Sequence, residues 1–396
     1  MRLLRAAVVV GFVAVVATGC GTSQETEEEP AGRQGSDKSW RRLPDAPLSP
    51  RDHAVIVGVG DRMLVVGGWE FLCPPNADCS FPEGSLLDNG AVYDATTDSW
   101  ETISPPPFGL RRTEYATASI DDTAYLLTGC ADDPSCDAPQ RLLSYSVAQD
   151  GWTDHGELPG PKHHRQLVAV GSELVAYSGS EEYGEAADLL FDPERARWTA
   201  VPDDPLPRSY DRFIVPVGDQ LVVVGSSLAA VDSGDDDMKQ VARFDLGNGR
   251  WTRLPDAPGR GYQLLATDRG PLLNGHFIDS PGWLLDPDTW TWSELPGQSG
   301  EQTDLSGVLN RDGAVYDIPN SVGRMAATTR LYLYDSTAGS LVAIPPPPTR
   351  EDVYDDSSAA LGRDLFIYGG QRWTGDGLDG DGELVGDAWL WSAPEE

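Results

Sequence analysis

Val65-Val66-Gly67-Gly68 and, further along, Tyr93-Asp94-Ala95-Thr96-Thr97-Asp98-Ser99-Trp100 are the stretches that decide the fold of this chain. The first is a short apolar run that ends in two glycines. The second places two large aromatic residues seven positions apart around a polar turn. Both units return at intervals of about fifty residues, so we interpret the sequence as an array of repeats before any single motif is considered.

The aromatic unit recurs along almost the whole chain. Its copies are Tyr93/Trp100, Tyr145/Trp152, Phe191/Trp198, Phe244/Trp251, Leu285/Trp292 and Tyr334/Leu341. Trp40 near the beginning and Trp391 near the end each stand alone, and together they would complete a seventh pair. We therefore expect seven units, of which the last is assembled from both ends of the chain.

The apolar unit recurs the same number of times. A polar turn precedes it, and its copies lie at residues 60–68, 121–129, 171–179, 218–225, 268–275, 312–316 and 363–370. Runs of four to six residues rich in Val, Leu, Ile and Tyr, bounded by Gly and Asp, are typical of β-strands. No stretch of the body sustains a helical period over three turns, so the sequence predicts an all-β protein.

The repeat resembles the kelch family. The matching features are the double glycines at 67–68 and 369–370, the seven-residue aromatic spacing, and Trp-x-x-Leu-Pro at Trp40 and Trp251. The resemblance implies a β-propeller of four-stranded blades. We predict a seven-bladed kelch-like β-propeller over residues 37–396, closed by pairing of Ser39 to Leu43 with the strand Val385 to Trp391. Closure leaves no open sheet around the ring, and we expect the outer-strand tryptophans to be mostly buried and structural.

The beginning of the chain predicts export. Arg2 and Arg5 precede the apolar run Ala6 to Ala17, which is shorter than the roughly 20 residues of a membrane-spanning helix. Ala17-Thr18-Gly19-Cys20 resembles the bacterial lipobox, with Ala17 where Leu is commoner, and implies cleavage before Cys20 and its acylation. An ordinary signal with an incidental cysteine is the alternative. Residues 1–19 are thus a predicted lipoprotein signal peptide.

Residues 20–36 are the predicted lipidated cysteine and a flexible acidic tether. This segment contains four glutamates and no large apolar side chain, so it cannot bury enough surface to fold. The formal net charge of the whole chain is −34, which excludes nucleic acid and anionic lipid surfaces as partners because both attract basic patches. We expect membrane contact through the lipid anchor only, at the outer side of a bacterial cytoplasmic membrane.

Four further cysteines lie in the body. An even number in an exported chain suggests disulfides, and four cysteines allow three pairings. The repeated Cys-x5-Cys spacing favours Cys73–Cys79 and Cys130–Cys136. A zinc site is the alternative, although no histidine lies near either pair in the sequence.

Candidate binding residues lie in two sets of links. In four-stranded blades the links between the second and third strands and between successive blades emerge on the same face, and long irregular loops of this kind often carry function. In the links between successive blades, a positive charge recurs beside a polar aromatic residue. The candidates are Arg51, His53, Arg112, Tyr115, His164, Arg165, Arg208, Tyr210, Arg260, Tyr262, Arg350 and Tyr354. An inward ring of Arg and Tyr would suit a carboxylate, phosphate or sugar. The alternative is structural: each Arg pairs with an Asp or a backbone carbonyl of a neighbouring blade.

An acidic loop near the end of the chain is a candidate calcium site. Its carboxylates alternate with glycines at Asp376, Asp379, Asp381 and Glu383. Ca²⁺ takes six to eight oxygen ligands from flexible turns. The alternative is a solvated loop in a very acidic protein. Apart from possible Ca²⁺, we expect no cofactor.

The sequence does not show catalysis, because its glycine-rich stretches lack the strand-to-helix setting of phosphate loops and no metal-ligand spacing is present. We interpret the chain as a non-catalytic binding or scaffold module for an envelope protein or glycan. The alternative is a carbohydrate-active enzyme that uses the Arg/Tyr/His mouth, similar to sialic-acid mutarotases or galactose oxidase. The sequence does not define the oligomeric state.

Overall fold

The computed structural model divides the chain into two compact units, residues 1–38 and Ser39–Glu396, and all described residues belong to the second. It describes residues 40–74, 77, 79, 86–110, 116–128, 140–160, 165–182, 184, 186–229, 238–259, 261, 263–274, 282–295, 308–310, 331–335, 340–344, 347–350, 353–354, 357–361, 364–374 and 381–392. Side chains are described at all of these positions except 274, 308–310, 331–335, 340–343 and 354. None of the described residues belongs to a helix with the length and apolarity needed to cross a bilayer.

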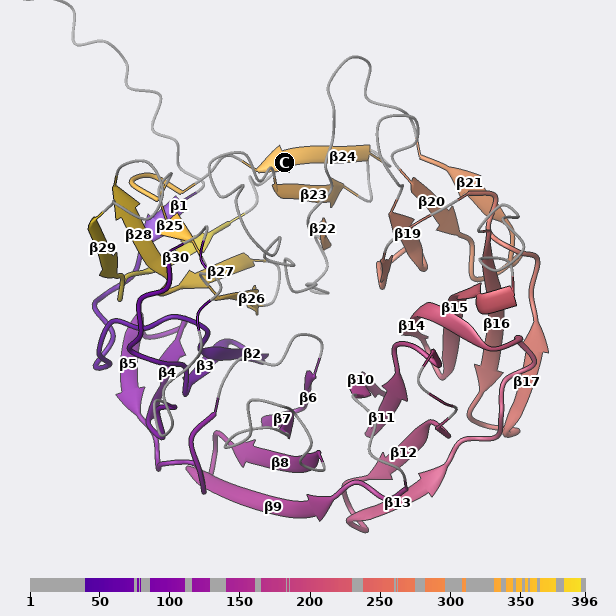
Figure 1. Cartoon of the computed structure of the whole chain (residues 1–396), viewed down its shortest axis with the longest axis horizontal. Helices are drawn as coiled ribbons and strands as arrows, with labels where there is room; N and C mark the ends of the chain where they lie inside the picture. The colour runs from indigo at the N-terminus through magenta and orange to yellow at the C-terminus, as the bar shows by residue number, and fades with distance from the viewer. Residues whose placement is uncertain are drawn as a thin grey trace, which may run out of the picture. The chain divides into compact units, whose positions relative to one another are not determined.

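The second unit is a series of small sheets that follow one another in chain order around a ring (Figure 1). Blade 1 contains β2 (Val55–Val59), β3 (Arg62–Val66), β4 (Gly90–Asp94) and β5 (Ser99–Thr102). Blade 2 contains β6 (Thr117–Ile120), β7 (Thr123–Thr128), β8 (Arg141–Ser146) and β9 (Gly151–Glu157). Blade 3 contains β10 (Arg165–Val170), β11 (Glu173–Ser178), β12 (Leu189–Asp192) and β13 (Arg197–Ala200). Blade 4 contains β14 (Ser209–Val217), β15 (Gln220–Ser227), β16 (Lys239–Asp245) and β17 (Arg250–Arg253). Blade 5 contains β18 (Leu264–Leu265), β19 (Leu272–Asn274), β20 (Gly282–Leu285) and β21 (Trp292–Glu294).

Blade 6 departs from the four-stranded antiparallel pattern. Its described strands are β22 (Val308–Asn310), β23 (Leu331–Asp335) and β24 (Ser340–Ile344), and β22 pairs with β23 in parallel. Parallel neighbours need a long connection between them, and here residues 311–330, which lie outside the described part, separate the two strands. The sequence of this repeat lacks the double glycine, which is consistent with its departure from the pattern.

Blade 7 closes the ring as predicted. It contains β26 (Ser357–Leu361), β27 (Asp364–Tyr368), β30 (Ala388–Trp391) and, as its outer strand, β1 (Trp40–Arg42). Trp40 lies opposite Trp391, and both side chains are buried. Between β27 and β30 the chain contributes to a further small sheet, in which β28 (Gln371–Thr374) pairs with both β25 (Val353–Tyr354) and β29 (Asp381–Leu384).

The core lies between neighbouring blades. In β3, Met63 and Val65 pack against blade 7, whereas Leu64 and Val66 pack against blade 2. Successive side chains of a strand point to opposite faces, so a strand buried on both faces needs an unbroken apolar run, and this explains the recurring Val- and Leu-rich stretches. Each such side chain stabilises the fold by about 1.5–3 kcal/mol when it is fully buried.

The aromatic repeat is a pair of residues facing each other across the third and fourth strands. Tyr93 lies opposite Trp100, and their ring centroids are 5.3 Å apart. Tyr93 is fully buried, whereas Trp100 is mostly covered but keeps some exposed surface, and its indole N–H donates to the Pro44 carbonyl at 2.8 Å. The outer tryptophans of blades 1 to 5 are all covered in this way, so our prediction that they are mostly buried is confirmed there. They lie on outermost strands, where one side of the indole meets solvent and its polar edge needs an acceptor.

The double glycine is the point at which one blade meets the next. Gly67 has a φ of 69°, and a Cβ at this position would lie 2.2 Å from the Leu110 carbonyl oxygen in the link to blade 2. Gly369 has a φ of 70°, and its Cβ would lie 2.4 Å from the Arg51 carbonyl oxygen. Only glycine combines the left-handed conformation with so close an approach of another backbone.

Candidate functional site

Arg51 lies in the link that enters blade 1, and its side chain is fully buried. Its guanidinium donates to the Gly67 carbonyl at 3.0 Å, to Asn89 Oδ1 at 2.7 Å, and to the backbone and side-chain oxygens of Ser49 at 3.0 and 2.9 Å. Burial lowers the pKa of this guanidinium by removing water from it. All of these acceptors belong to the chain itself, so the geometry supports the structural alternative at Arg51.

Arg350 repeats this arrangement in blade 7. Its Nη1 donates to Asp387 Oδ1 at 2.6 Å, and its Nη2 donates to the Gly369 carbonyl. Gly369 directly follows the second strand of blade 7 and Asp387 directly precedes the third, as Gly67 and Asn89 do in blade 1. A guanidinium can hold a carbonyl and a side-chain oxygen at once because its donors form a rigid fork. Each of the two arginines therefore joins the link that enters its blade to the end of the second strand and the start of the third strand of that blade.

Arg212 makes two further buried ion pairs, at the junction of blades 3 and 4, and the sequence did not single it out. Its Nη2 lies 2.6 Å from Asp188 Oδ2 and 2.8 Å from Asp204 Oδ2, and its Nη1 donates to the Ser178 carbonyl at 3.2 Å. Burial alone would lower the pKa of the guanidinium, but the two carboxylates outweigh it and raise that pKa. Arg212 lies at a bulge of β14, so the sequence offered no spacing that would distinguish it from Arg208.

The predicted residues of blades 3 and 4 have separate surroundings. Arg165 is buried, and its backbone N–H and carbonyl both bond the side-chain amide of Gln140, at 2.7 and 3.1 Å. Burial lowers the pKa of the Arg165 guanidinium. Arg208 is exposed and donates to the Glu181 carbonyl at 2.6 Å. The structure therefore does not place these two side chains in equivalent positions.

Tyr210 faces the buried lysine of blade 4. Lys239 Nζ lies 5.7 Å from the centre of the Tyr210 ring and donates to Ser226 Oγ at 2.6 Å. A carboxylate oxygen of Asp211 lies 3.5 Å from the same nitrogen. A cation over an aromatic face is attracted by the ring quadrupole, so Tyr210 contributes to holding this charge in the interior.

His53 is held in a fixed orientation at the junction of blades 7 and 1. Its Nδ1 lies 3.2 Å from Asp52 Oδ1, and its ring stacks on Trp69 with centroids 4.3 Å apart. His53 has a φ of 49°, a conformation that costs a non-glycine residue energy and persists only where its surroundings hold it. The backbones of Asp52 and Trp69 bond each other in both directions, at 3.2 and 3.1 Å, which supplies that support.

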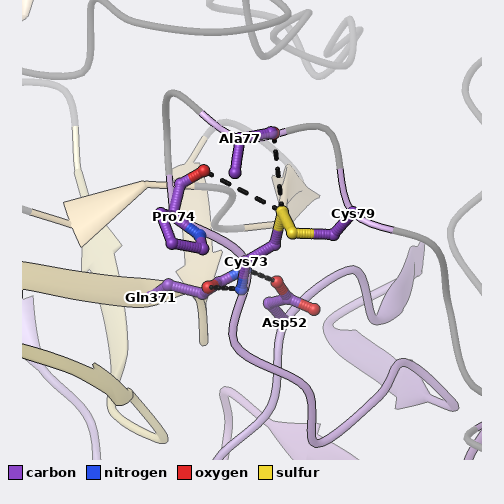
Figure 2. Close-up of a disulfide and its surroundings, with 6 residues drawn as sticks. All are labelled: Asp52, Cys73, Pro74, Ala77, Cys79 and Gln371. Carbon is purple, nitrogen blue, oxygen red and sulfur yellow. Dashed lines mark hydrogen bonds between the residues drawn. A yellow bond between two sulfur atoms is a disulfide. The ribbon is translucent and has the colours of Figure 1, made fainter. Parts of the chain in front are cut away.

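A series of hydrogen bonds links Asp52, the neighbour of His53, to a disulfide (Figure 2). Gln371, on β28, donates to the buried carboxylate of Asp52 and accepts from the Cys73 backbone N–H at 2.8 Å. Cys73 is bonded to Cys79, as the spacing predicted. This bond uses both thiols, so the zinc alternative does not apply to this pair. Cys130 and Cys136 lie outside the described residues, as does Cys20.

Several predicted site residues cannot be placed. Arg112, Tyr115, His164, Arg260 and Tyr262 lie outside the described residues, and only the backbone of Tyr354 is described. Ligand binding by the set as a whole therefore stays a prediction.

The calcium site is only half described. Asp376 and Asp379 lie outside the described residues, while Asp381 and Glu383 lie on β29, two positions apart and so on the same side of the strand. Glu383 accepts a hydrogen bond from Arg372 at 2.6 Å. Within the described part of the chain, no three His, Cys, Asp or Glu residues are grouped so that they could hold a metal ion. Calcium binding stays a prediction.

Comparison with known proteins relates the chain to kelch-repeat proteins at low identity. No family model matches it. It is 23% identical over 278 residues to the F-box/kelch-repeat protein At1g80440 of Arabidopsis thaliana. The aligned region covers 66% of this chain and 72% of the relative. It is 27% identical over 194 residues to the human Kelch repeat and BTB domain-containing protein 12, which covers 45% of this chain and 30% of the relative. It is 23% identical over 260 residues to the human Kelch-like protein 34, which covers 59% of this chain and 38% of the relative. The chain thus spans well under half of the two human proteins, and together with the repeated sheets these similarities support a kelch-like propeller.

Proposed function

We propose that this chain is a non-catalytic binding or scaffold module for an envelope protein or glycan, held by a lipid at the outer side of a bacterial membrane. The observation that carries the proposal is the closed ring, in which β1 completes the last blade. A closed ring of small sheets is a rigid platform that leaves only short, protected strand edges. Sites on such a platform are held more precisely than sites on isolated loops.

The buried arginines described at the loop-bearing face support the rigid frame that the proposed module needs. The described cations there are held by the chain's own carbonyls and carboxylates, as at Arg51, Arg350 and Arg212. These bonds hold the links that connect the blades in place. The longer links can therefore vary in sequence and length while the ring of blades stays unchanged. The kelch names of the relatives point to the same class of module.

Lipid anchoring is tested by fractionation of the cells that produce the full chain. We expect the chain to sediment with membranes and to carry fatty acid on Cys20, detected by mass spectrometry of the N-terminal peptide. The variant Cys20→Ser should appear in the soluble exported fraction, since several acyl chains are needed for stable anchoring. Identical distribution of the two proteins would contradict the anchor.

Binding is tested with two probes, an extract of exported envelope proteins and the isolated envelope polysaccharide of the same cells. The purified chain should show saturable binding to one of the two. Absence of saturable binding to both would contradict the proposal. A change in the mass of the polysaccharide after incubation would instead favour the carbohydrate-active alternative.

A further inference from the structure

A disulfide lies close to the junction of blades 7 and 1 (Figure 2). It joins Cys73 to Cys79 in the loop that follows β3, and both residues keep some surface exposed to solvent. The Cys73 backbone N–H donates to Gln371 Oε1 at 2.8 Å, although the two residues lie 298 positions apart in the sequence. Disulfides that solvent reaches are those that thiols reduce most readily. The oxidation state of this bond therefore bears on the contact between the two ends of the chain.

The Gln371 side chain connects this loop to the link that enters blade 1. It is only 1% exposed, and its amide nitrogen donates to the carboxylate of Asp52, which is also 1% exposed. Its amide oxygen accepts from Cys73. A buried oxygen that loses its donor destabilises the arrangement around it. The position of Gln371, and with it the contact to Asp52, therefore depends on where Cys73 is held.

Asp52 in turn supports the candidate residue His53. The backbones of Asp52 and Trp69 exchange two hydrogen bonds, at 3.2 and 3.1 Å, and the His53 ring stacks on Trp69. Across the same junction, the Gly370 N–H donates to the Arg51 carbonyl at 2.9 Å. His53 has a left-handed backbone that persists only where its surroundings hold it. Loosening of these contacts would therefore release the His53 side chain as well.

We infer that the Cys73–Cys79 disulfide is a redox-sensitive latch on the junction of blades 7 and 1. In the oxidised chain, the bond between two residues six positions apart restricts the loop and keeps the Cys73 N–H on Gln371. The ring stays closed by β1 in both redox states, so the latch controls how firmly the junction and His53 are held. This inference goes beyond the proposed binding function and does not depend on it.

The chemistry of the latch is thiol–disulfide exchange. A dithiol transfers two electrons and two protons to the disulfide, the S–S bond of the chain breaks, and a disulfide forms in the reductant. The two free thiols of the chain no longer restrict the loop. The Cys73 N–H then leaves Gln371 more often, and the junction opens locally at a higher rate.

Hydrogen–deuterium exchange of the full chain, measured by mass spectrometry before and after reduction with dithiothreitol, tests this inference. The chain carries Cys130→Ser and Cys136→Ser, so that Cys73 and Cys79 are its only cysteines apart from Cys20. A second variant, Cys73→Ala with Cys79→Ala, lacks the bond without any reductant. It should exchange like the reduced chain.

We expect reduction to speed exchange about tenfold in the peptides that contain the backbone amides of Asp52, Trp69 and Gly370. Peptides from β15 of blade 4 should exchange at the same rate in both redox states. The change is expected to be local because β15 does not contribute to the junction of blades 7 and 1.

The variant Gln371→Met tests whether Gln371 transmits the effect, since Met is similar in size and makes neither hydrogen bond. Its junction peptides should exchange rapidly in the oxidised form, and reduction should add less than about twofold. Thr374→Val, at the exposed end of the same strand, is the matched control and should keep the tenfold response.

A tenfold change that is confined to the junction and is removed by Gln371→Met supports the latch. Unchanged junction peptides after reduction would overturn it, as would an equal change in β15 or a full response in Gln371→Met. If Gln371→Met does not fold, the chain with Cys73→Ala and Cys79→Ala decides, and exchange at the rate of the oxidised chain would overturn the latch. None of these results alters the binding test of the proposed function.

Discussion

Gly67 and Gly369 show how a single residue type fixes the contact between two blades. At each position the backbone is left-handed, and the carbonyl of the next blade occupies the space of a Cβ. The N–H groups of the following glycines, Gly68 and Gly370, donate to the same carbonyls, at 2.7 and 2.9 Å. The double glycine of the repeat is thus explained by two requirements, a backbone conformation and a close approach.

Alanine substitutions separate these two requirements. Gly60→Ala tests the left-handed conformation alone, because nothing lies within 4 Å of the added Cβ. It should lower the free energy of unfolding by about 1–2 kcal/mol. Gly67→Ala adds the clash with Leu110 and should cost roughly 2–5 kcal/mol in total. Urea unfolding of both variants measures the difference. Equal losses would show that the close approach does not matter.

His155 predicts a dependence of stability on pH. It lies on β9 with its Nε2 2.8 Å from Ser144 Oγ and its ring 5.1 Å from that of Phe191. Burial lowers its pKa from the ordinary 6.5, so the unfolded chain binds the proton more readily than the folded chain. The stability contributed by the neutral ring is complete above about pH 6.5 and falls as the pH decreases towards the folded pKa.

The variant His155→Asn isolates this contribution. The slope of the unfolding free energy against pH below 6.5 should become smaller than in the unaltered chain, by at most about 1.4 kcal/mol per pH unit for one proton. Chemical denaturation at a series of pH values provides the slopes. Parallel curves for the two proteins would show that His155 does not titrate differently on folding.

At the scale of strands and links, local patterns were predictable and distant pairings were not. The seven-residue aromatic spacing predicted the pairing of Tyr93 with Trp100, because both lie on one hairpin and a short turn sets their register. The Cys-x5-Cys spacing predicted the Cys73–Cys79 disulfide, because these two residues are likewise close together in the sequence. By contrast, Arg212 meets Asp188, which lies in a different blade, and no spacing in the sequence identifies such partners.

The ion pairs of Arg212 should stabilise the junction of blades 3 and 4. Arg212→Met would leave the carboxylates of Asp188 and Asp204 together without their cation and should cost about 3–5 kcal/mol. Arg208→Ala is the matched control, since that side chain is exposed, and should cost at most about 1 kcal/mol. Urea denaturation of both variants measures the costs. A loss at Arg208 as large as that at Arg212 would contradict this division of roles.

At the scale of the molecule, the number of blades and the closure followed from counting repeats. Trp40 and Trp391 predicted their own pairing because each lacked the partner that every other repeat has nearby. The parallel pairing in blade 6 could not be predicted, since its repeat is degraded and only the three-dimensional arrangement brings β22 beside β23. The function of the arginines was left open by the sequence for a related reason. Repetition along the chain is equally compatible with a structural role and with a ring of binding groups.

Closure of the ring by the first strand is tested most directly by comparing the melting temperatures of two bodies, residues 37–396 and residues 45–396. The shorter body lacks Trp40 and Leu43, which are 8% and 2% exposed. Loss of two such side chains costs roughly 5–10 kcal/mol, and at about 2 °C per kcal/mol the melting temperature should fall by at least about 10 °C. A synthetic peptide of residues 37–48 should restore most of the loss by filling the vacant edge of β30. Equal melting temperatures for the two bodies, with no effect of the peptide, would contradict the closed propeller.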